Sequence, residues 1–282
     1  MTKKSRREFL ALTGAGALAG ILHDPAIPRG KNVGDSHSSP VSFTLGIASY
    51  SFRAFTLDQD IAMTKRLGIK KLALKDVHMP LKSSDEDILA TVDKLKAEGL
   101  ELSSCGVIYM TNEDEVNNAF RYARAAGISF MVGCPDEPLL KLVERMVKQT
   151  GIALAIHNHG PTDKRYPSPE SAYRLVEGMD KRMGLCIDVG HTQRLGLDPA
   201  HEVERFSDRL LDIHMKDVSS ADAGGTELEI GRGVIDIPKL ISTLARVKYS
   251  NTIHFEHEKD EKDPLPGVAE SVGYVRGIIA TM

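Results

Sequence analysis

Short apolar runs alternate with longer amphipathic runs from about residue 40 to the end of the chain. The short runs are rich in β-branched residues, as is typical of buried strands, whereas the longer runs place apolar residues at helical spacing. The predicted strands are 43–49, 71–75, 100–108, 129–134, 153–158, 183–188, 210–216 and 252–256. The predicted helices include 85–98, 113–126, 137–150, 168–178, 238–247 and 268–280.

A glycine followed by an aliphatic residue recurs where helices are expected to end and strands to begin. The four instances are Gly68-Ile69, Gly99-Leu100, Gly127-Ile128 and Gly151-Ile152, and glycine is the usual residue after a helix C-terminus. Eight strand–helix units in about 250 residues is the size of a (β/α)8 TIM barrel. An open doubly wound α/β sheet also alternates strands and helices, but the Gly-rich phosphate motifs common in such sheets are missing here. We therefore predict a single barrel domain over residues 42–282.

The N-terminal residues have the pattern of an export signal rather than of a folded domain. Basic residues at positions 3, 4, 6 and 7 precede the uncharged stretch 9–22. Ser5-Arg6-Arg7-Glu8-Phe9-Leu10 resembles a twin-arginine signal, and Ala17-Leu18-Ala19 resembles a signal-peptide cleavage site. A basic amphipathic helix is the alternative, but the clustered glycines disfavour it. We expect an export signal over 1–22 and a flexible Pro/Gly/Ser-containing linker over 23–41.

This signal predicts a periplasmic or otherwise extracytoplasmic protein that meets the twin-arginine translocase during export. The 282-residue chain has a formal charge of −3. Removing residues 1–19 takes away four basic residues and Glu8, a net charge of +3, which leaves −6. A negative mature chain disfavours a nucleic-acid partner. No apolar run reaches the length of a membrane-spanning helix, so we expect no stable span after processing.

Apolar residues make up 41% of the chain, which excludes disorder for most of it. Three cysteines are an odd number, and each lies in or beside an apolar run. We therefore expect buried thiols rather than a disulfide framework.

Histidine, lysine and carboxylate residues gather at the predicted C-terminal ends of strands, where barrel enzymes carry their functional groups. On a single strand, such residues would most simply be solvated polar side chains without a function. Here, however, the pattern repeats on four neighbouring strands. Imidazole nitrogens and carboxylate oxygens are ligands that Zn, Mn, Fe and Co share. The pattern therefore favours a divalent metal site. The residues in question are Lys75, His157, His159, Asp188, His191, His214, Lys216 and Glu256.

Residues from about 43 to 282 resemble the xylose isomerase-like TIM barrel family, often called sugar phosphate isomerases/epimerases. The resemblance rests on Cys186-Ile187-Asp188-Val189-Gly190-His191, on Asp212-Ile213-His214-Met215-Lys216-Asp217, on Glu229-Ile230-Gly231-Arg232-Gly233-Val234-Ile235-Asp236 and on Phe255-Glu256. It implies one divalent metal ion (Mn, Zn, Co, Fe or Mg) held by residues at the ends of strands 5 to 8.

Three of the four ligand positions that the resemblance implies match Asp188, His214 and Glu256, and the strand 5 position carries His157 in place of glutamate. Family epimerases use two glutamates as an acid/base pair, and Glu256 is the one that remains. His157 is then either a ligand or the second proton-transfer group.

Lys75 is another candidate for proton transfer, unless it simply pairs with Asp76 or another carboxylate. We assign His159, His191, Lys216 and Arg232 to substrate binding, although Arg232 also fits a solvated loop position.

These features predict an exported, metal-dependent isomerase or epimerase that acts through an enediolate on a non-phosphorylated sugar or keto-sugar. The alternative is a metal-dependent lyase that expels the aglycone of a 3-keto-glycoside by β-elimination, since elimination needs one strong base and an acid. An apurinic-site endonuclease or a sugar-binding protein fits less well, because the chain is acidic and the ligand set is intact. The sequence does not decide whether the protein forms a homo-oligomer.

The export signal can be tested by replacing Arg6 and Arg7 together with lysine. We expect the variant protein to stay in the cytoplasm, because the arginine pair is the feature that defines this signal. Cell fractionation with immunoblotting measures the distribution, and the conversion of Lys3 and Lys4 to arginine is the matched control. Undiminished export of the variant would contradict the predicted signal.

Overall fold

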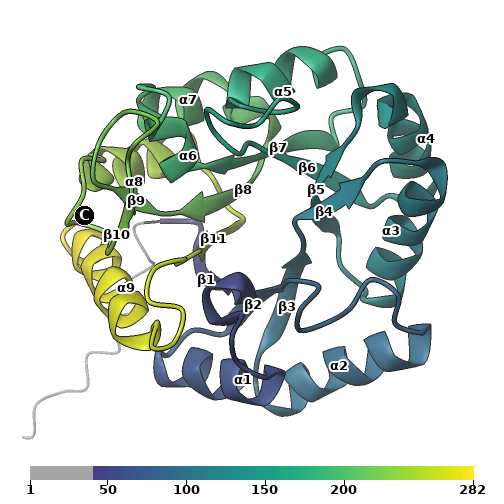
Figure 1. The fold of residues 1–282 in the computed structure, drawn as a ribbon, viewed down its shortest axis with the longest axis horizontal. Coiled ribbons are helices and arrows are strands. Elements are labelled where there is room, and N and C mark those ends of the chain that lie inside the picture. Colours follow the sequence, from purple (N-terminus) through teal and green to yellow (C-terminus); the bar gives the residue numbers. More distant parts are fainter. Residues whose placement is uncertain (1–40) are drawn as a thin grey trace, which may run out of the picture. The chain divides into compact units, whose positions relative to one another are not determined.

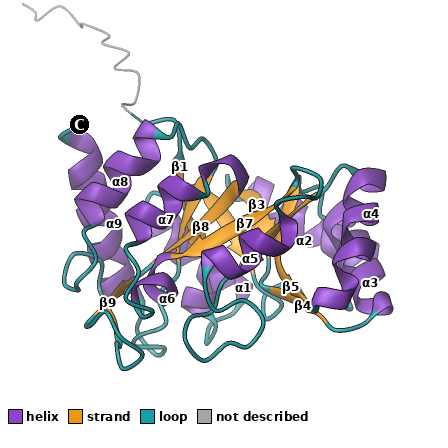
Figure 2. Cartoon of the chain, turned by 90° about the horizontal axis from the view of Figure 1, so that it is seen from above, coloured by secondary structure: helices purple, strands orange, loops and turns teal. Residues whose placement is uncertain are grey.

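A computed structural model describes residues 41–282 of the chain. The predicted export signal and all but the last residue of the predicted linker lie outside the described residues. Within the described part, a ring of strands forms the centre and helices surround it, as Figure 1 shows face-on and Figure 2 from above. The strands are β1 (Thr44–Ala48), β2 (Lys71–Leu74), β3 (Glu101–Cys105), β4 (Ile108–Met110), β5 (Phe130–Pro135), β6 (Ala153–His157), β7 (Met183–Asp188), β8 (Leu210–Met215), β9 (Asp217–Val218), β10 (Glu227–Leu228) and β11 (Thr252–Phe255).

The order of strand pairing closes the sheet into a barrel. Nine described strands pair side by side in parallel, in the order β3-β2-β1-β11-β8-β7-β6-β5-β4. The two end strands, β3 and β4, are successive segments of the single strand predicted over 100–108. Because β3 pairs with β2 and β4 pairs with β5, this interrupted strand links the two sides of the sheet. The predicted TIM barrel is thereby confirmed, and the open sheet is ruled out.

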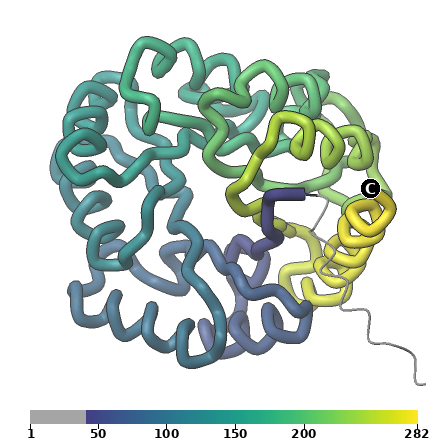
Figure 3. Tube along the Cα trace, turned by 180° about the vertical axis from the view of Figure 1, so that it is seen from behind, coloured from purple at the N-terminus to yellow at the C-terminus, as the bar shows by residue number. Residues whose placement is uncertain are grey.

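All six predicted helices form. They are α2 (Asp85–Ala97), α3 (Glu113–Ala125), α4 (Leu140–Thr150), α5 (Pro169–Val176), α8 (Ile237–Arg246) and α9 (Leu265–Ala280), and the structure adds α1 (Leu57–Arg66), α6 (Val189–Gln193) and α7 (Pro199–Arg205). Seen from behind in Figure 3, the chain colours follow one another around the ring, because each helix leads back to the next strand. In the described residues, β9 and β10 form a separate two-stranded antiparallel ribbon beyond the end of β8.

Local sequence signals set the helix boundaries. The side chains of Ser84 and Asn112 accept hydrogen bonds from the backbone N–H three residues on, which satisfies N–H groups that the helix itself leaves unpaired. The four recurrent glycines at positions 68, 99, 127 and 151 all have positive φ, from 64° to 78°, a conformation that L-residues with a side chain disfavour. Each therefore ends a helix and lets the chain turn into the next strand, as predicted.

The apolar residues of strands and helices form one core, and Cys105, Cys134 and Cys186 are buried within it as free thiols. The prediction that the three cysteines are buried thiols is confirmed. Among the described residues, no helix has both the length and the apolar content required to cross a membrane.

One buried polar pair links α1 to the segment after β2. The hydroxyl of Thr64 donates to Oδ1 of Asp60, while Oδ2 of Asp60 lies 3.6 Å from Nδ1 of His78. Nε2 of His78 lies 3.0 Å from the carbonyl oxygen of Phe55. A carbonyl only accepts, so Nε2 carries the hydrogen and Nδ1 presents a lone pair to Asp60. Burial raises the pKa of Asp60 to about 7 and lowers the pKa of His78, so below about pH 7 the neutral acid faces the neutral imidazole.

The substitution Asp60→Asn is expected to remove a pH dependence of stability. The pKa of Asp60 in the folded state lies above its unfolded value of 3.8, so its contribution is complete below about pH 4 and is lost as the pH rises through about 7. This amounts to about 2.5 kcal/mol between about pH 5 and about pH 8. Urea unfolding at the two pH values should show that difference shrink in the variant, since asparagine can donate to His78 and still accept from Thr64.

The exposed substitution Glu86→Gln is the control and should leave the pH dependence unchanged. An Asp60→Asn protein with the wild-type pH dependence would show that Asp60 is ionised in the fold.

Candidate functional site

Four potential metal ligands meet at the C-terminal ends of adjacent strands. His157 ends β6, Asp188 ends β7, His214 lies in β8 and Glu256 follows β11 directly. These strands are neighbours in the order β6-β7-β8-β11. One nitrogen or oxygen atom from each side chain lies within 4.8 Å of those of the other three, and all four residues are buried. The ring of strands thus brings together residues that are 99 positions apart in the sequence.

The contacts within this group are short. Nε2 of His157 lies 3.1 Å from Nδ1 of His214, and the same Nδ1 lies 3.1 Å from Oε2 of Glu256. Oδ2 of Asp188 lies 3.6 Å from Nε2 of His157. Burial lowers the pKa of His157 well below its ordinary value, which keeps the ring neutral. For His214, burial alone would lower the pKa, but the carboxylates of Glu256, Asp212 and Asp188 together outweigh burial and raise the pKa.

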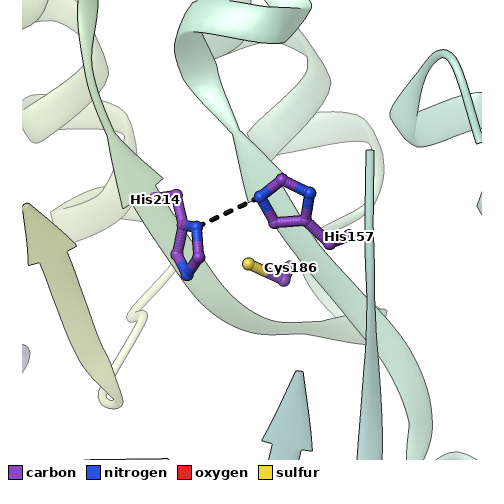
Figure 4. Close-up of side chains that lie close together, drawn as sticks. All are labelled: His157, Cys186 and His214. Carbon is purple, nitrogen blue, oxygen red and sulfur yellow. Dashed lines mark hydrogen bonds between the residues drawn. The ribbon is translucent and has the colours of Figure 1, made fainter. Parts of the chain in front are cut away.

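Cys186 offers a different third ligand beside the two histidines. Its sulfur and the two imidazoles are also within 4.8 Å of one another, and Figure 4 shows the sulfur lying close to both rings. Burial, together with the charges of Asp212 and Asp188, raises the pKa of the Cys186 thiol well above its ordinary value. Because the thiolate is the form that binds metals, the carboxylates are the better ligands here.

Lys216 brings a buried positive charge to the same place. Its ammonium lies 3.3 Å from Oδ2 of Asp188 and 3.0 Å from Oε2 of Glu256, and it also contacts Glu258. Burial would destabilise the charged form of all these groups, but the opposite charges outweigh it. They hold the pKa of Asp188 and Glu256 below their usual range and raise that of Lys216. Three carboxylates against one ammonium leave a formal charge of −2.

The donor set fits one divalent cation. Two imidazoles and two carboxylates are ligands of first-row divalent ions, and a charge of +2 would neutralise the remaining −2. In addition, Oδ2 of Asp188 is buried and makes no hydrogen bond to the described residues, although the Lys216 ammonium lies 3.3 Å away. Buried oxygens without a hydrogen bond are rare in proteins, and a bound ion would supply a further positive partner.

A buried carboxylate, Asp212, lies behind His214, on the side away from the cluster. While Nδ1 of His214 faces the cluster, its Nε2 lies 4.0 Å from Oδ2 of Asp212. Oδ1 of Asp212 lies 2.7 Å from Nδ1 of His254, whose Nε2 lies 2.7 Å from the hydroxyl of Ser103. A carboxylate behind a ligating histidine commonly orients the ring and raises its basicity. Gly46 makes room for this arrangement, since a Cβ there would lie 2.7 Å from the His254 ring.

A cavity of about 160 Å³ opens above the cluster. Glu256, Glu258 and Lys216 line one part of it, and Lys75, Tyr109 and His159 line another. The carboxylates come from the end of β11, whereas Tyr109 belongs to β4 and His159 follows β6. The cavity therefore has a carboxylate-bearing side and a side of hydroxyl, imidazole and ammonium groups.

His159 lies between Tyr109 and Asp163 and contacts both, an arrangement that the sequence did not reveal. Nδ1 of His159 lies 3.1 Å from Oδ2 of Asp163, and its Nε2 lies 3.0 Å from the hydroxyl of Tyr109. Since a carboxylate accepts, Nδ1 carries the hydrogen and Nε2 accepts from the phenol. Burial and the nearby negative groups raise the pKa of Tyr109 to about 12, so the phenol is a proton donor. No spacing signal connects Tyr109 with Asp163, which is why only the fold pairs them.

The other predicted site residues differ in how close they come to the cluster. Lys75 lines the cavity, and its ammonium donates to the carbonyl of Val107 at 3.1 Å. Within the described chain Lys75 forms no ion pair, so the alternative of pairing with Asp76 is not seen. His191 lies on α6 rather than on the end of a strand, with Nε2 4.0 Å from Asp188. Arg232 is not brought to the cavity, because its exposed guanidinium pairs with Glu270 on α9.

The chain belongs to the xylose isomerase-like TIM barrel family, which it matches over residues 57–278. It is 30% identical over 151 residues to the rhizopine catabolism protein MocC of Rhizobium meliloti, covering 48% of this chain and 46% of MocC. It is 28% identical over 145 residues to the inosose dehydratase of Geobacillus kaustophilus, covering 46% of this chain and 45% of that enzyme. The chain thus spans about half the length of these curated relatives.

Among solved structures, the fold is similar to that of the IolI protein with a bound zinc atom. The TM-score is 0.70 at 14% identity, and the match covers 85% of this chain and 99% of the IolI chain. At this identity the likeness concerns the fold. The family places the protein among relatives that include enzymes acting on sugar-like compounds.

The buried ammonium can be tested with Lys216→Met in the presence of a chelator. We expect a loss of about 3 to 5 kcal/mol in the free energy of unfolding, because Asp188 and Glu256 lose the cation that compensates them. Urea unfolding measures the change. The same substitution at the exposed Lys239, which pairs with Asp198, should have only a small effect. A Lys216→Met protein as stable as the wild type would mean that these carboxylates do not need Lys216.

Proposed function

We propose that the protein is a divalent-metal-dependent enzyme that removes the proton next to the ketone of a non-phosphorylated keto-sugar or inositol-like compound and then eliminates a group from the neighbouring carbon. The observation that carries this proposal is the buried group of His157, Asp188, His214 and Glu256 at the cavity. These four residues would hold the ion. When bound, such an ion supplies Lewis-acid polarisation of the ketone, which acidifies the adjacent C–H.

Glu256 is the proposed base. It borders the cavity, and neighbouring Lys216 and His214 keep its pKa well below the ordinary value although burial opposes this. The carboxylate is therefore ionised and able to accept a proton. Lys216 fixes the carboxylate by a 3.0 Å contact. His157, neutral and buried, is better placed as a ligand than as a second base.

Tyr109 is the proposed acid. Its phenol donates to Nε2 of His159, whose other nitrogen lies beside Asp163. The phenol gives its proton to the leaving group, and the phenolate then regains a proton from solvent, to which Tyr109 is exposed. Lys75 lines the same part of the cavity, and its ammonium lies 5.9 Å from the centre of the Tyr109 ring. Lys75 is proposed to bind a substrate oxygen, as are His191 and Lys216 at the cavity wall.

Elimination is favoured over epimerisation because the two sides of the cavity carry different groups. Epimerisation removes and returns a proton on opposite faces of one carbon, whereas both cavity carboxylates, Glu256 and Glu258, come from the end of β11. Similarity to an inosose dehydratase also supports elimination. Isomerisation or epimerisation, which the family resemblance implies, is the second candidate, since Tyr109 or Lys75 offers a proton on the other side.

One feature supports a substrate without phosphate. The predicted export signal would place the enzyme outside the cytoplasm, away from phosphosugars. The location outside the cytoplasm and the substrate without phosphate are both parts of the proposal.

Product analysis tests the reaction. Tag-free protein is stripped with a chelator, reloaded with Mn, Zn or Co, and incubated in D2O with a panel of ketoses and 3-keto-glycosides, with NMR as the measurement. Released aglycone and an unsaturated ketone indicate elimination, whereas a recovered isomer with deuterium on one carbon indicates epimerisation. Turnover that survives complete metal removal, or no turnover of any carbohydrate, would overturn the proposal.

Within this assay, we expect Glu256→Gln to retain part of the bound metal and to lose turnover by about 10²- to 10⁴-fold, as for removal of a general base. Tyr109→Phe should lower turnover while metal content is unchanged. Glu261→Gln, an exposed neighbour, is the control. A fully active Glu256→Gln enzyme would remove Glu256 from the role of base.

A further inference from the structure

A second group of metal-ligand side chains lies beside the first, on different residues. Glu229 follows β10, and His257 and Asp260 lie in the segment after β11. One donor atom from each of the three lies within 4.8 Å of the other two. Glu229 and His257 are buried, with 7% and 4% of their surface exposed, and Asp260 is exposed. The proposed catalytic chemistry uses none of these residues.

Two buried atoms in this group have no hydrogen-bond partner in the described chain, Nε2 of His257 and Oε2 of Glu229. The other ring nitrogen of His257, Nδ1, lies 3.2 Å from Oε1 of Glu227. Because the carboxylate only accepts, Nδ1 carries the hydrogen, and Nε2 is left with a free lone pair. This is the arrangement in which a carboxylate behind the ring prepares a histidine to bind a metal.

Space is kept open next to these atoms. A Cβ at Gly267, in the first turn of α9, would lie 2.8 Å from Nε2 of His257 and 3.4 Å from Oε1 of Glu229. A cavity of about 660 Å³ lined by Glu229, Asp260 and Gly267 leads to the surface. In Figure 1, β10 lies next to α9, and a hydrogen bond from the backbone of Ile230 to the hydroxyl of Ser271 joins the two segments.

Lys259 supplies a positive charge but does not complete the group. Its ammonium lies 2.7 Å from Oε1 of Glu229 and 3.7 Å from Oδ2 of Asp260, which leaves Oε2 of Glu229 free. Together with Glu227, three carboxylates face one ammonium, a formal charge of −2. A divalent cation would neutralise this charge and satisfy both unpartnered atoms.

We propose that Glu229, His257 and Asp260 form a second site for one divalent cation of the Zn, Mn or Co type. One imidazole and two carboxylates suit these ions better than Ca or Mg, which prefer all-oxygen surroundings. The ion would join the segment after β11, which begins next to Glu256, to the segment after β10. The site does not depend on the proposed catalytic function.

Metal counting tests the site. Tag-free protein is stripped with a chelator, titrated with ZnCl2 or MnCl2 by calorimetry, and analysed for bound metal after gel filtration. We expect Asp260→Asn and Gly267→Ala each to bind one ion fewer per chain than the wild type. Asparagine keeps the left-handed backbone of Asp260, whose φ is 53°, and alanine at position 267 fills the open space without removing a ligand. Asp263→Asn, an exposed acidic neighbour, is the matched control and should match the wild type.

Lys259→Gln gives an opposite expectation. Removal of the competing ammonium should tighten binding at this site by roughly tenfold, whereas a merely structural ion pair would give no such gain. The proposal is overturned if Asp260→Asn and Gly267→Ala, shown to be folded by circular dichroism, bind as many ions as the wild type. The measured quantity is the difference in bound ions between variant and wild type. If the central site bound no ion, the wild type would bind one ion and the variants none, so this test would still be valid.

Discussion

Negative charge buried at the ends of parallel strands is the constraint around which this barrel is arranged. Asp188 and Glu256 are almost wholly removed from water, and a buried carboxylate is stable only with a nearby opposite charge. Lys216 provides that charge by direct contact with both carboxylates, and His214 also contacts Glu256. With Glu258 included and His214 neutral, these groups carry a formal charge of −2, which is the charge that the proposed divalent ion would balance.

The replacement of an expected glutamate by His157 changes this balance. A third buried carboxylate beside Asp188 and Glu256 would add a negative charge, whereas His157 is neutral because burial lowers its pKa. The site thus keeps a donor atom but loses a second base. In the proposed mechanism, proton donation then falls to Tyr109, whose hydroxyl is hydrogen-bonded to His159 beside Asp163. This difference between the two sides distinguishes the site from one built on two matched glutamates.

Much of the fold could be predicted because it depends on local patterns. The strands at 153–158 and 183–188 have nearly continuous apolar stretches, and the structure has β6 and β7 there to within a residue. The short helices α6 and α7 were not predicted, because five to seven residues give too little periodicity. His191 consequently lies on a helix. Arg232 was placed with the substrate from its motif alone, but Glu270, 38 residues on, holds it at the surface.

By itself, the sequence determined the alternation of strands and helices, the glycines that end the helices, and the polar residues at strand ends, since these follow from periodicity and backbone conformation. Strand order and the closing contact through β3 and β4 then decided which polar residues meet. The pairing of Tyr109 with His159 and Asp163, the position of Asp212 between His214 and His254, and the group of Glu229, His257 and Asp260 came only from the tertiary structure. Side chains from distant segments meet only when the barrel closes, and no spacing along the chain records that distance.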